Sequence, residues 1–109
     1  MVVSDEDIAY ATDLFAPLGH ITSRKMMGGA SIYADGQIFS ILRSDGVLMI
    51  KAKDALADDL EAEGSFKFTM EDKKTGKERS MHYWSMPDAA FDDPEEACAW
   101  ARKSLKARF

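Results

Sequence analysis

The sequence has few of the residues that build disulfides, metal centres and membrane spans. Its single cysteine, Cys98, cannot form an internal disulfide and belongs to no Cys-x-x-Cys pair. Its two histidines, His20 and His82, lie far apart, so nothing in their spacing indicates a metal site. No apolar run approaches the ~20 residues that cross a bilayer, and the start MVVSDEDIAY lacks the basic flank and apolar segment of a secretory signal. We therefore expect a cytoplasmic protein that does not enter membranes.

An excess of basic charge is also missing. The chain of 109 residues carries a net charge of -5 and has a pI near 4.9. Non-specific binding to nucleic acid or anionic lipid needs a net basic surface, so this net charge weighs against both kinds of binding. It does not exclude a local strip of basic residues. The length suits one domain over residues 1–109, and 46% hydrophobic residues are enough for a core.

Capping residues and apolar spacing predict three helices, over residues 4–18, 54–63 and 94–107. Ser4 supplies a hydroxyl cap for the first helix, and Gly19 is placed to stop it. The last helix begins with Asp93 as the cap and Glu96 three residues later, which is the spacing of a capping box. The adjoining acidic cluster is explained by this helix start and needs no catalytic role.

Between the helices, short β-rich segments are separated by the turn dipeptides GG, DG and SDG. The expected strands are ITSRKMM, ASIYA, QIFSILR, VLMIKA, SFKFTMED and RSMHYWSM. The alternation in SFKFTMED predicts that Phe66, Phe68 and Met70 share a core-facing side. The fold class is therefore α+β: an antiparallel sheet of about five to six strands with N-terminal, middle and C-terminal helices, in two layers.

Several of these strands are apolar on both faces. In QIFSILR, Phe39 and Ile41 oppose Ile38 and Leu42. A sheet whose helices all lie on one side would leave the other face partly exposed, and large exposed apolar patches mark interfaces. A homodimer is the expected consequence.

Gly28 and Gly29 do not form a phosphate-binding loop. They belong neither to a GxGxxG nor to a GxxxxGK[ST] motif, and a strand rather than a helix is expected to follow them. A tight turn between the first two strands explains them, through positive φ or close backbone approach. The sequence thus predicts no catalytic residue, no cofactor and no metal.

Basic residues on the expected strands and turns leave a nucleic-acid surface open as an alternative. They are Arg24, Lys25, Lys51, Lys53, Lys67, Lys73, Lys74, Lys77 and Arg79. Acidic residues are interspersed among them, so a solvated sheet face explains them equally well.

A set of residues spread over most of the chain matches the order of a known family pattern. It comprises Arg24, Met26, Gly28, Gly29, Tyr33, Gly36, Phe39, Leu48-Met49-Ile50-Lys51 and Met81-His82-Tyr83-Trp84-Ser85-Met86-Pro87. In this order the residues resemble the TfoX N-terminal domain family, whose R-x-M-F-G-G signature precedes a hairpin and a distant M-x-Y-x-x-x-P. Two departures stand out, because Met27 replaces the usual phenylalanine and Ala30-Ser31 replaces a common aromatic and glycine.

The resemblance implies an α+β domain without known enzymatic activity, similar to the first half of bacterial competence regulators of the TfoX/Sxy type. Those regulators act with a cyclic-AMP-receptor-type activator at promoters of DNA-uptake genes, and they carry a second domain. The sequence ends at Phe109, so we expect a single-domain relative to which the competence role does not transfer directly.

Two functions are therefore predicted, in order of preference. The first is a regulatory or adaptor domain that acts through an unidentified protein partner, and the alternative is a direct nucleic-acid-binding module that uses the basic strand surface. An enzyme or small-molecule binder that uses a cleft beside the glycine pair ranks last. The candidate interaction residues are Arg24, Lys25, Met26, Met27 and the exposed parts of Tyr83 and Trp84.

Overall fold

The fold is a curled antiparallel sheet with helices packed on one side. The structure is a computed structural model that describes residues 3–26, 28–71, 74–76 and 78–106. Its helices are α1 (Asp5–Leu14), α2 (Ala55–Ala62) and α3 (Pro94–Lys106), with short 3₁₀ helices η1 (Ala16–Leu18) and η2 (Asp88–Ala90). Its strands are β1 (Ile21–Met26), β2 (Gly29–Ala34), β3 (Gln37–Leu42), β4 (Leu48–Lys51), β5 (Lys67–Glu71) and β6 (Glu78–Ser85). The expected α+β class is confirmed.

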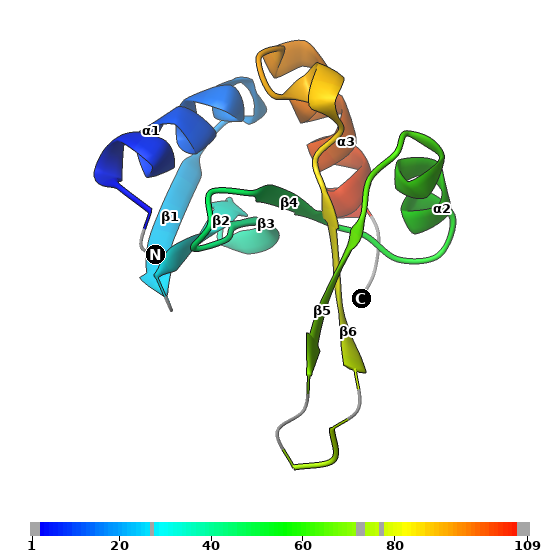
Figure 1. Ribbon diagram of the computed structural model, residues 1–109. Helices are drawn as coiled ribbons and strands as arrows, with labels where there is room; N and C mark the ends of the chain where they lie inside the picture. The colour runs from blue at the N-terminus through cyan, green and yellow to red at the C-terminus, as the bar shows by residue number, and fades with distance from the viewer. Residues whose placement is uncertain (1–2, 27, 72–73, 77, 107–109) are drawn as a thin grey trace.

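The strand order is β1-β2-β3-β4-β6-β5, and every neighbouring pair is antiparallel. The first four strands follow one another, whereas β6 lies between β4 and β5, so β1 and β5 are the two edges. Figure 1 shows α1 and α3 together on one side of the sheet, and the β5–β6 hairpin extending away from them. The α2 residues Leu56 and Leu60 belong to the same core, so no helix of the described residues covers the opposite face.

The first helix is shorter than the sequence predicts. Ser4 caps it as expected: the Asp7 amide donates to the Ser4 hydroxyl (3.1 Å), and the Asp7 carboxylate accepts from the Ser4 amide (3.0 Å). The α-helix ends at Leu14, and residues 16–18 form the 3₁₀ turn η1. Pro17 explains the difference, because it has no amide to donate and its ring crowds the carbonyl four residues earlier.

The start of α3 also differs in one detail. The Asp93 side chain accepts from the amides of Glu95 (3.1 Å) and Glu96 (3.4 Å), as a cap should. The amide of Asp93, however, donates to the carbonyl of Ala90 at 3.4 Å. The reciprocal half of the expected capping box is thus replaced by a bond to η2.

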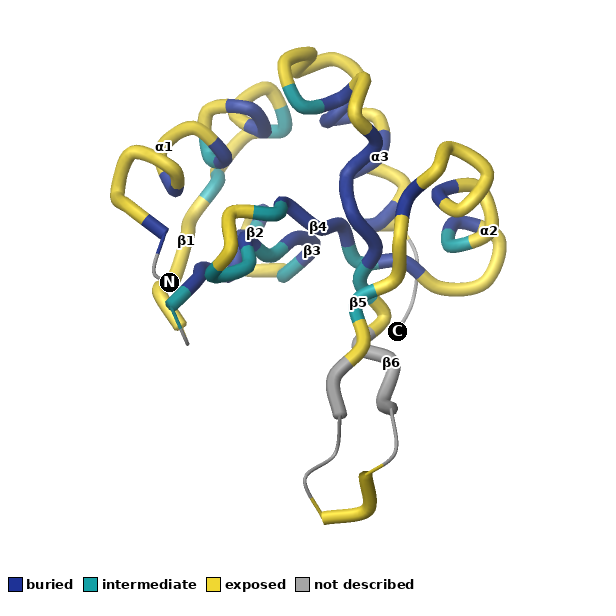
Figure 2. The backbone as a smooth tube through the Cα atoms, viewed as in Figure 1, coloured by how far each residue is buried: buried dark blue, intermediate teal, exposed yellow. Residues whose placement is uncertain are grey.

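The core lies between the helices and one face of the sheet, with its buried residues concentrated on β2, β3, β4 and α3 (Figure 2). A β-bulge contributes its largest ring pair. Ile32 pairs with Ser40, but the next residue, Tyr33, pairs with Ile38, so Phe39 is an extra residue in β3. The fully buried Phe39 ring meets the Phe15 ring edge to face, with centroids 4.8 Å apart. The bulge thereby anchors the sheet to the chain just after α1.

The prediction that Phe66 and Phe68 face the core is wrong. Phe66 is 49% exposed and Phe68 is half-buried, and both rings lie near Arg43, outside the helix-covered core. The physical reason is the place of the segment in the sheet. It forms the edge beside β6, where α1 and α3 do not cover it, so its apolar alternation marks a surface instead.

Candidate functional site

A hollow of about 340 Å³ opens on the face of the sheet that the helices leave uncovered. Its walls come from β1, from the β3–β4 connection and from the β5–β6 hairpin. The lining residues are Met26, Gly29, Ala30, Ile41, Leu42, Arg43, Ser44, Asp45, Phe68 and Tyr83. We call this site the hollow, and the face that holds it the concave face.

The sheet forms this hollow because it curls. Met26 lies on β1 and Phe68 on β5, at the two opposite edges of the sheet, yet both line the same hollow. Sheet twist and β-bulges produce such curvature. The register shifts in the β2–β3 pair and again in the β5–β6 pair, and His82 of β6 has a φ of 58°. These two register shifts accompany the curl that places the edge strands on either side of one cavity.

Two strand residues outside the helix-covered core cluster are also buried. Met49 is fully buried, and Ser31 is 1% exposed. The Ser31 hydroxyl donates to the sulfur of Met26, which holds the thioether of this wall residue toward the sheet. The wall residue Met26 thus contacts a buried polar neighbour on the adjacent strand.

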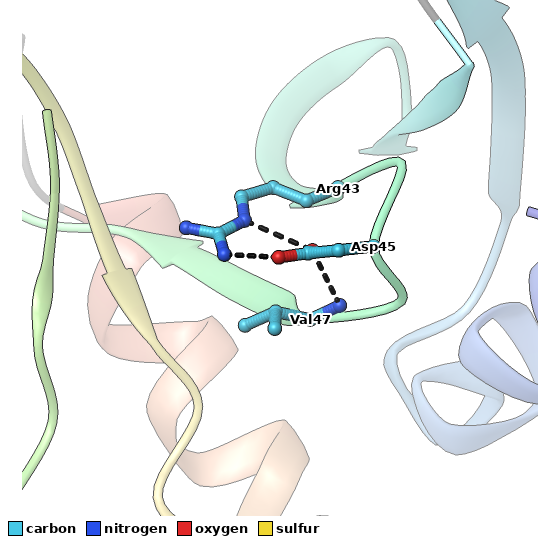
Figure 3. Close-up of polar contacts among 3 residues, drawn as sticks. All are labelled: Arg43, Asp45 and Val47. Carbon is cyan, nitrogen blue, oxygen red and sulfur yellow. Dashed lines mark hydrogen bonds and ion pairs between the residues drawn. The ribbon is translucent and has the colours of Figure 1, made fainter. Parts of the chain in front are cut away.

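A fixed ion pair forms one rim of the hollow (Figure 3). The guanidinium of Arg43 makes a two-pronged contact with the Asp45 carboxylate, in which Nε lies 3.0 Å from Oδ1 and Nη2 binds Oδ2. Asp45 Oδ1 also accepts from the Val47 amide at 3.2 Å, which closes the loop between β3 and β4. The hydrogen bonds from Arg43 lower the pKa of Asp45 to about 2.

Arg43 also lies over two aromatic rings of the opposite wall. Its guanidinium carbon is 5.2 Å from the Phe68 centroid and 5.6 Å from the Phe66 centroid. The Asp45 carboxylate balances the charge of Arg43, and the two rings lie against the guanidinium group of Arg43. The rim is therefore close to electrically neutral, and the hollow offers mainly apolar contact to a ligand.

The Arg43–Asp45 pair predicts a specific acid titration. Because the folded-state pKa of Asp45 is below its ordinary value of 3.8, the stabilisation from the pair is complete above about pH 4 and is lost as the pH falls toward 2. Asp45 is 48% exposed, so solvent screening limits this contribution to less than about 1 kcal/mol. A carbon-detected NMR titration should place the Asp45 midpoint near 2. In Arg43→Ala it should rise toward the ordinary value, and a wild-type midpoint already near 3.8 would contradict the pair.

Three of the residues predicted from the sequence come together on the concave face. Met26 lines the hollow and is 46% exposed, and Arg24, two residues earlier on the same strand face, is also exposed. Tyr83 forms part of the opposite wall, where burial, aided by the nearby Tyr33, raises the pKa of its phenol to about 12. Met26 of β1 and Tyr83 of β6 thus line one cavity, and Arg24 lies beside Met26 on β1.

The other predicted residues lie elsewhere. Lys25 points to the helix side of β1, where its ammonium is 2.6 Å from Asp5. Trp84 is only 8% exposed and belongs to the helix-covered core, so the expectation that it adds an exposed part to the surface is not met. Its neighbour Tyr83 faces the opposite way because successive strand residues alternate. Met27 lies outside the described residues.

The two glycines shape the β1–β2 hairpin in different ways. Gly28 is in the turn with a φ of 81°, and its carbonyl accepts from the Val3 amide at 2.8 Å. Gly29 is the first residue of β2, where a Cβ would lie 2.1 Å from the carbonyl oxygen of Leu42. One glycine supplies a left-handed conformation and the other permits close approach to β3.

Sequence reasoning missed the rim residues Arg43 and Asp45 and the wall residue Ile41. The SDG segment predicts only a hairpin turn, although an arginine two residues before an aspartate across a tight turn is well placed for an ion pair. The stacking of Arg43 on Phe68 had no local signal, since the two residues are distant in sequence and meet only through the curl of the sheet.

Metal ligands do not gather in the part of the chain that the structure describes. There, no group of three or more His, Cys, Asp or Glu residues is placed to hold a metal ion. Cys98 is buried, its thiol lies 3.6 Å from the Leu14 carbonyl, and burial raises the pKa of the thiol. The predicted absence of catalysis and of cofactors stays a prediction, and the hollow itself supplies shape and apolar surface.

Comparison with known proteins gives one match. Residues 13–108 match the family model described as the TfoX N-terminal domain. None of the curated proteins compared matches the chain. Among the described residues, no helix is long and apolar enough to cross a membrane.

Proposed function

Because the chain belongs to the TfoX N-terminal domain family, we propose that it is a non-catalytic regulatory or adaptor domain that binds another protein through the concave face. The family is associated with competence regulation, and control of transcription is the process we propose for this chain. The proposed compartment is the cytoplasm, where a lone cysteine stays reduced.

The observation that carries this proposal is the hollow. It is apolar, it lies on the sheet face that no helix of the described residues covers, and exposed Met26 and Phe66 flank it. Protein interfaces combine an apolar, often aromatic and methionine-bearing centre with a polar rim. Here the Arg43–Asp45 pair supplies the rim.

The nucleic-acid alternative is supported less well. Its basic residues divide between the faces: Arg24 lies on the concave face, Lys25 pairs with Asp5, and the Lys67 ammonium lies over the ring of core residue Trp84 at 5.8 Å. Two of the other residues in the expected strip, Lys73 and Lys77, lie outside the described residues. A mobility-shift assay at low salt tests the alternative, because phosphate-driven binding would appear there and fall steeply as salt is added.

Replacing Met26 with glutamate should abolish binding of the protein partner and leave the fold intact. The new carboxylate would stand in the apolar wall, whereas the position is half exposed and tolerates charge within about 0.5 kcal/mol of folding stability. Affinity capture from native cells with wild type and variant, read by quantitative mass spectrometry, measures the effect.

The matched control is Ala9→Glu, which adds the same charge at an exposed site on α1, away from the hollow. It should capture the same proteins as wild type. Equal capture by wild type and Met26→Glu would refute the concave face as the binding surface.

The homodimer expected from the sequence stays a prediction. Burial of the concave face in a dimer would place Met26 and Phe66 at the interface. Sedimentation velocity at micromolar concentration measures it directly, and a monomer at all concentrations would contradict it.

A further inference from the structure

We propose that the hollow receives one large apolar side chain from a segment of the partner protein, and that Arg24 binds a carboxylate of the same segment. The partner would thus present an acidic and apolar peptide. This inference rests on the proposed function and adds the chemistry of the partner to it.

The size of the hollow limits what can enter. At about 340 Å³ it lies at the lower end of the range for small-molecule sites, roughly 300 to 1,000 Å³. That volume accommodates one or two large side chains and is too small for a whole helix. Met26 and Phe68 stand on opposite walls, so an inserted side chain would contact apolar surface on both sides.

Arg24 supplies the charge that selects the segment. It lies two residues before Met26 on the same face of β1, a Cα separation of about 7 Å. It is exposed, and it forms no ion pair within the described residues. Arg43, by contrast, is already bound to Asp45. Arg24 is therefore the cation beside Met26 that remains available to a ligand.

The distribution of acidic residues supports the same choice. The chain has a net charge of -5, and its helices carry many of the acidic side chains, among them Asp5, Glu6, Asp7, Asp58, Asp59, Glu61, Glu95 and Glu96. An acidic segment would be repelled from those acidic side chains. On the concave face, the exposed Arg24 places a favourable charge contact beside the hollow.

The test starts from a random peptide library displayed on phage. The library is selected on wild-type protein and counter-selected on Met26→Glu, which retains only peptides that need the hollow. The expected sequences combine a large apolar residue with Asp or Glu close by. Enrichment of basic peptides, or of peptides without a large apolar residue, would overturn the inference.

Affinities of a synthetic peptide from this selection provide the second measurement. By fluorescence anisotropy, Arg24→Glu should raise its Kd roughly tenfold, because attraction becomes repulsion. Lys25→Glu is the matched control: it makes the same charge change on the next residue, whose side chain points to the opposite face. Its Kd should stay within about twofold of wild type. If the two substitutions raise the Kd equally, the effect comes from the overall electrostatic potential of the protein and not from a contact with Arg24, and the proposal is refuted.

The outcomes separate this inference from the proposed function. If Met26→Glu abolishes partner capture while Arg24→Glu leaves both capture and peptide binding unchanged, the interface stands and the acidic partner is refuted. If no peptide is enriched and Arg24→Glu instead dissociates a dimer in sedimentation, a second copy of the chain occupies the face and the inference fails.

Discussion

Replacing Gly29 with alanine is expected to lower the free energy of unfolding by about 3 kcal/mol, at the upper end of overpacking effects. The added Cβ would lie 2.1 Å from the carbonyl oxygen of Leu42 and 3.2 Å from its carbonyl carbon. Both atoms belong to the backbone of the neighbouring strand, so no side-chain rotation can relieve the clash. The two strands would have to separate where β2 pairs with β3. Urea unfolding followed by tryptophan fluorescence measures the loss.

Gly36→Ala is the matched control for this substitution. Gly36 has a φ of 82° in the β2–β3 turn, but nothing lies within 4 Å of a Cβ placed there. The same added methyl group should therefore cost only about 1 kcal/mol, from the left-handed backbone. If the two variants lose equal stability, close approach is not the constraint at Gly29.

Replacing Phe39 with alanine should be the most destabilising change, by about 4 kcal/mol. Phe39 is fully buried and is the extra residue of the β3 bulge, and its ring packs edge to face on Phe15. Removing it leaves a cavity between the sheet and the chain after α1. Thermal and urea unfolding both measure the loss, and half-buried Ile38→Ala, next in the sequence, should cost less than about 2 kcal/mol.

A double-mutant cycle isolates the ring contact. Phe15→Ala and Phe39→Ala together should lose about 1 kcal/mol less than the sum of the single losses, because each single variant already removes the edge-to-face pair. Full additivity would mean that the two rings contribute only independent burial. A loss at Phe39 no larger than that at Ile38 would contradict the anchoring role of the bulge.

Local features of this protein could be predicted because local chemistry causes them. Ser4 caps α1 through an amide three residues away, and the turn glycine Gly28 needs its positive φ whatever surrounds it. Strand existence follows from apolar alternation and turn dipeptides. The alternation also shows that Tyr83 and Trp84 face opposite ways, but it does not say which face the helices cover. Because the helices cover the face that holds Trp84, Trp84 lies in the core and Tyr83 lines the hollow.

The candidate site could be predicted only in part, for the same reason. Arg24 and Met26 stand close together in one short basic and methionine-bearing stretch, whereas the edge position of Phe68 depends on the order of the strands. The insertion of β6 between β4 and β5 joins segments far apart in sequence, and no residue in either segment specifies the pairing partner locally. Arg43 makes two contacts on the rim. Its ion pair with Asp45 joins residues two positions apart and can be expected from the sequence, whereas its contact with the Phe68 ring joins distant segments and cannot.

By itself, the amino-acid sequence determined the α+β class, the positions of the helices and strands to within a few residues, the glycine hairpin and the family, because each rests on spacing within short segments. Only the tertiary structure decided that the sheet is concave, that its two edges enclose one hollow, and that Arg24 and Lys25 point to opposite faces with different neighbours. Curvature arises from bulges acting on paired strands, and burial arises from helices that pack on one face. Both are properties of the assembled sheet, so they emerge only when distant segments meet.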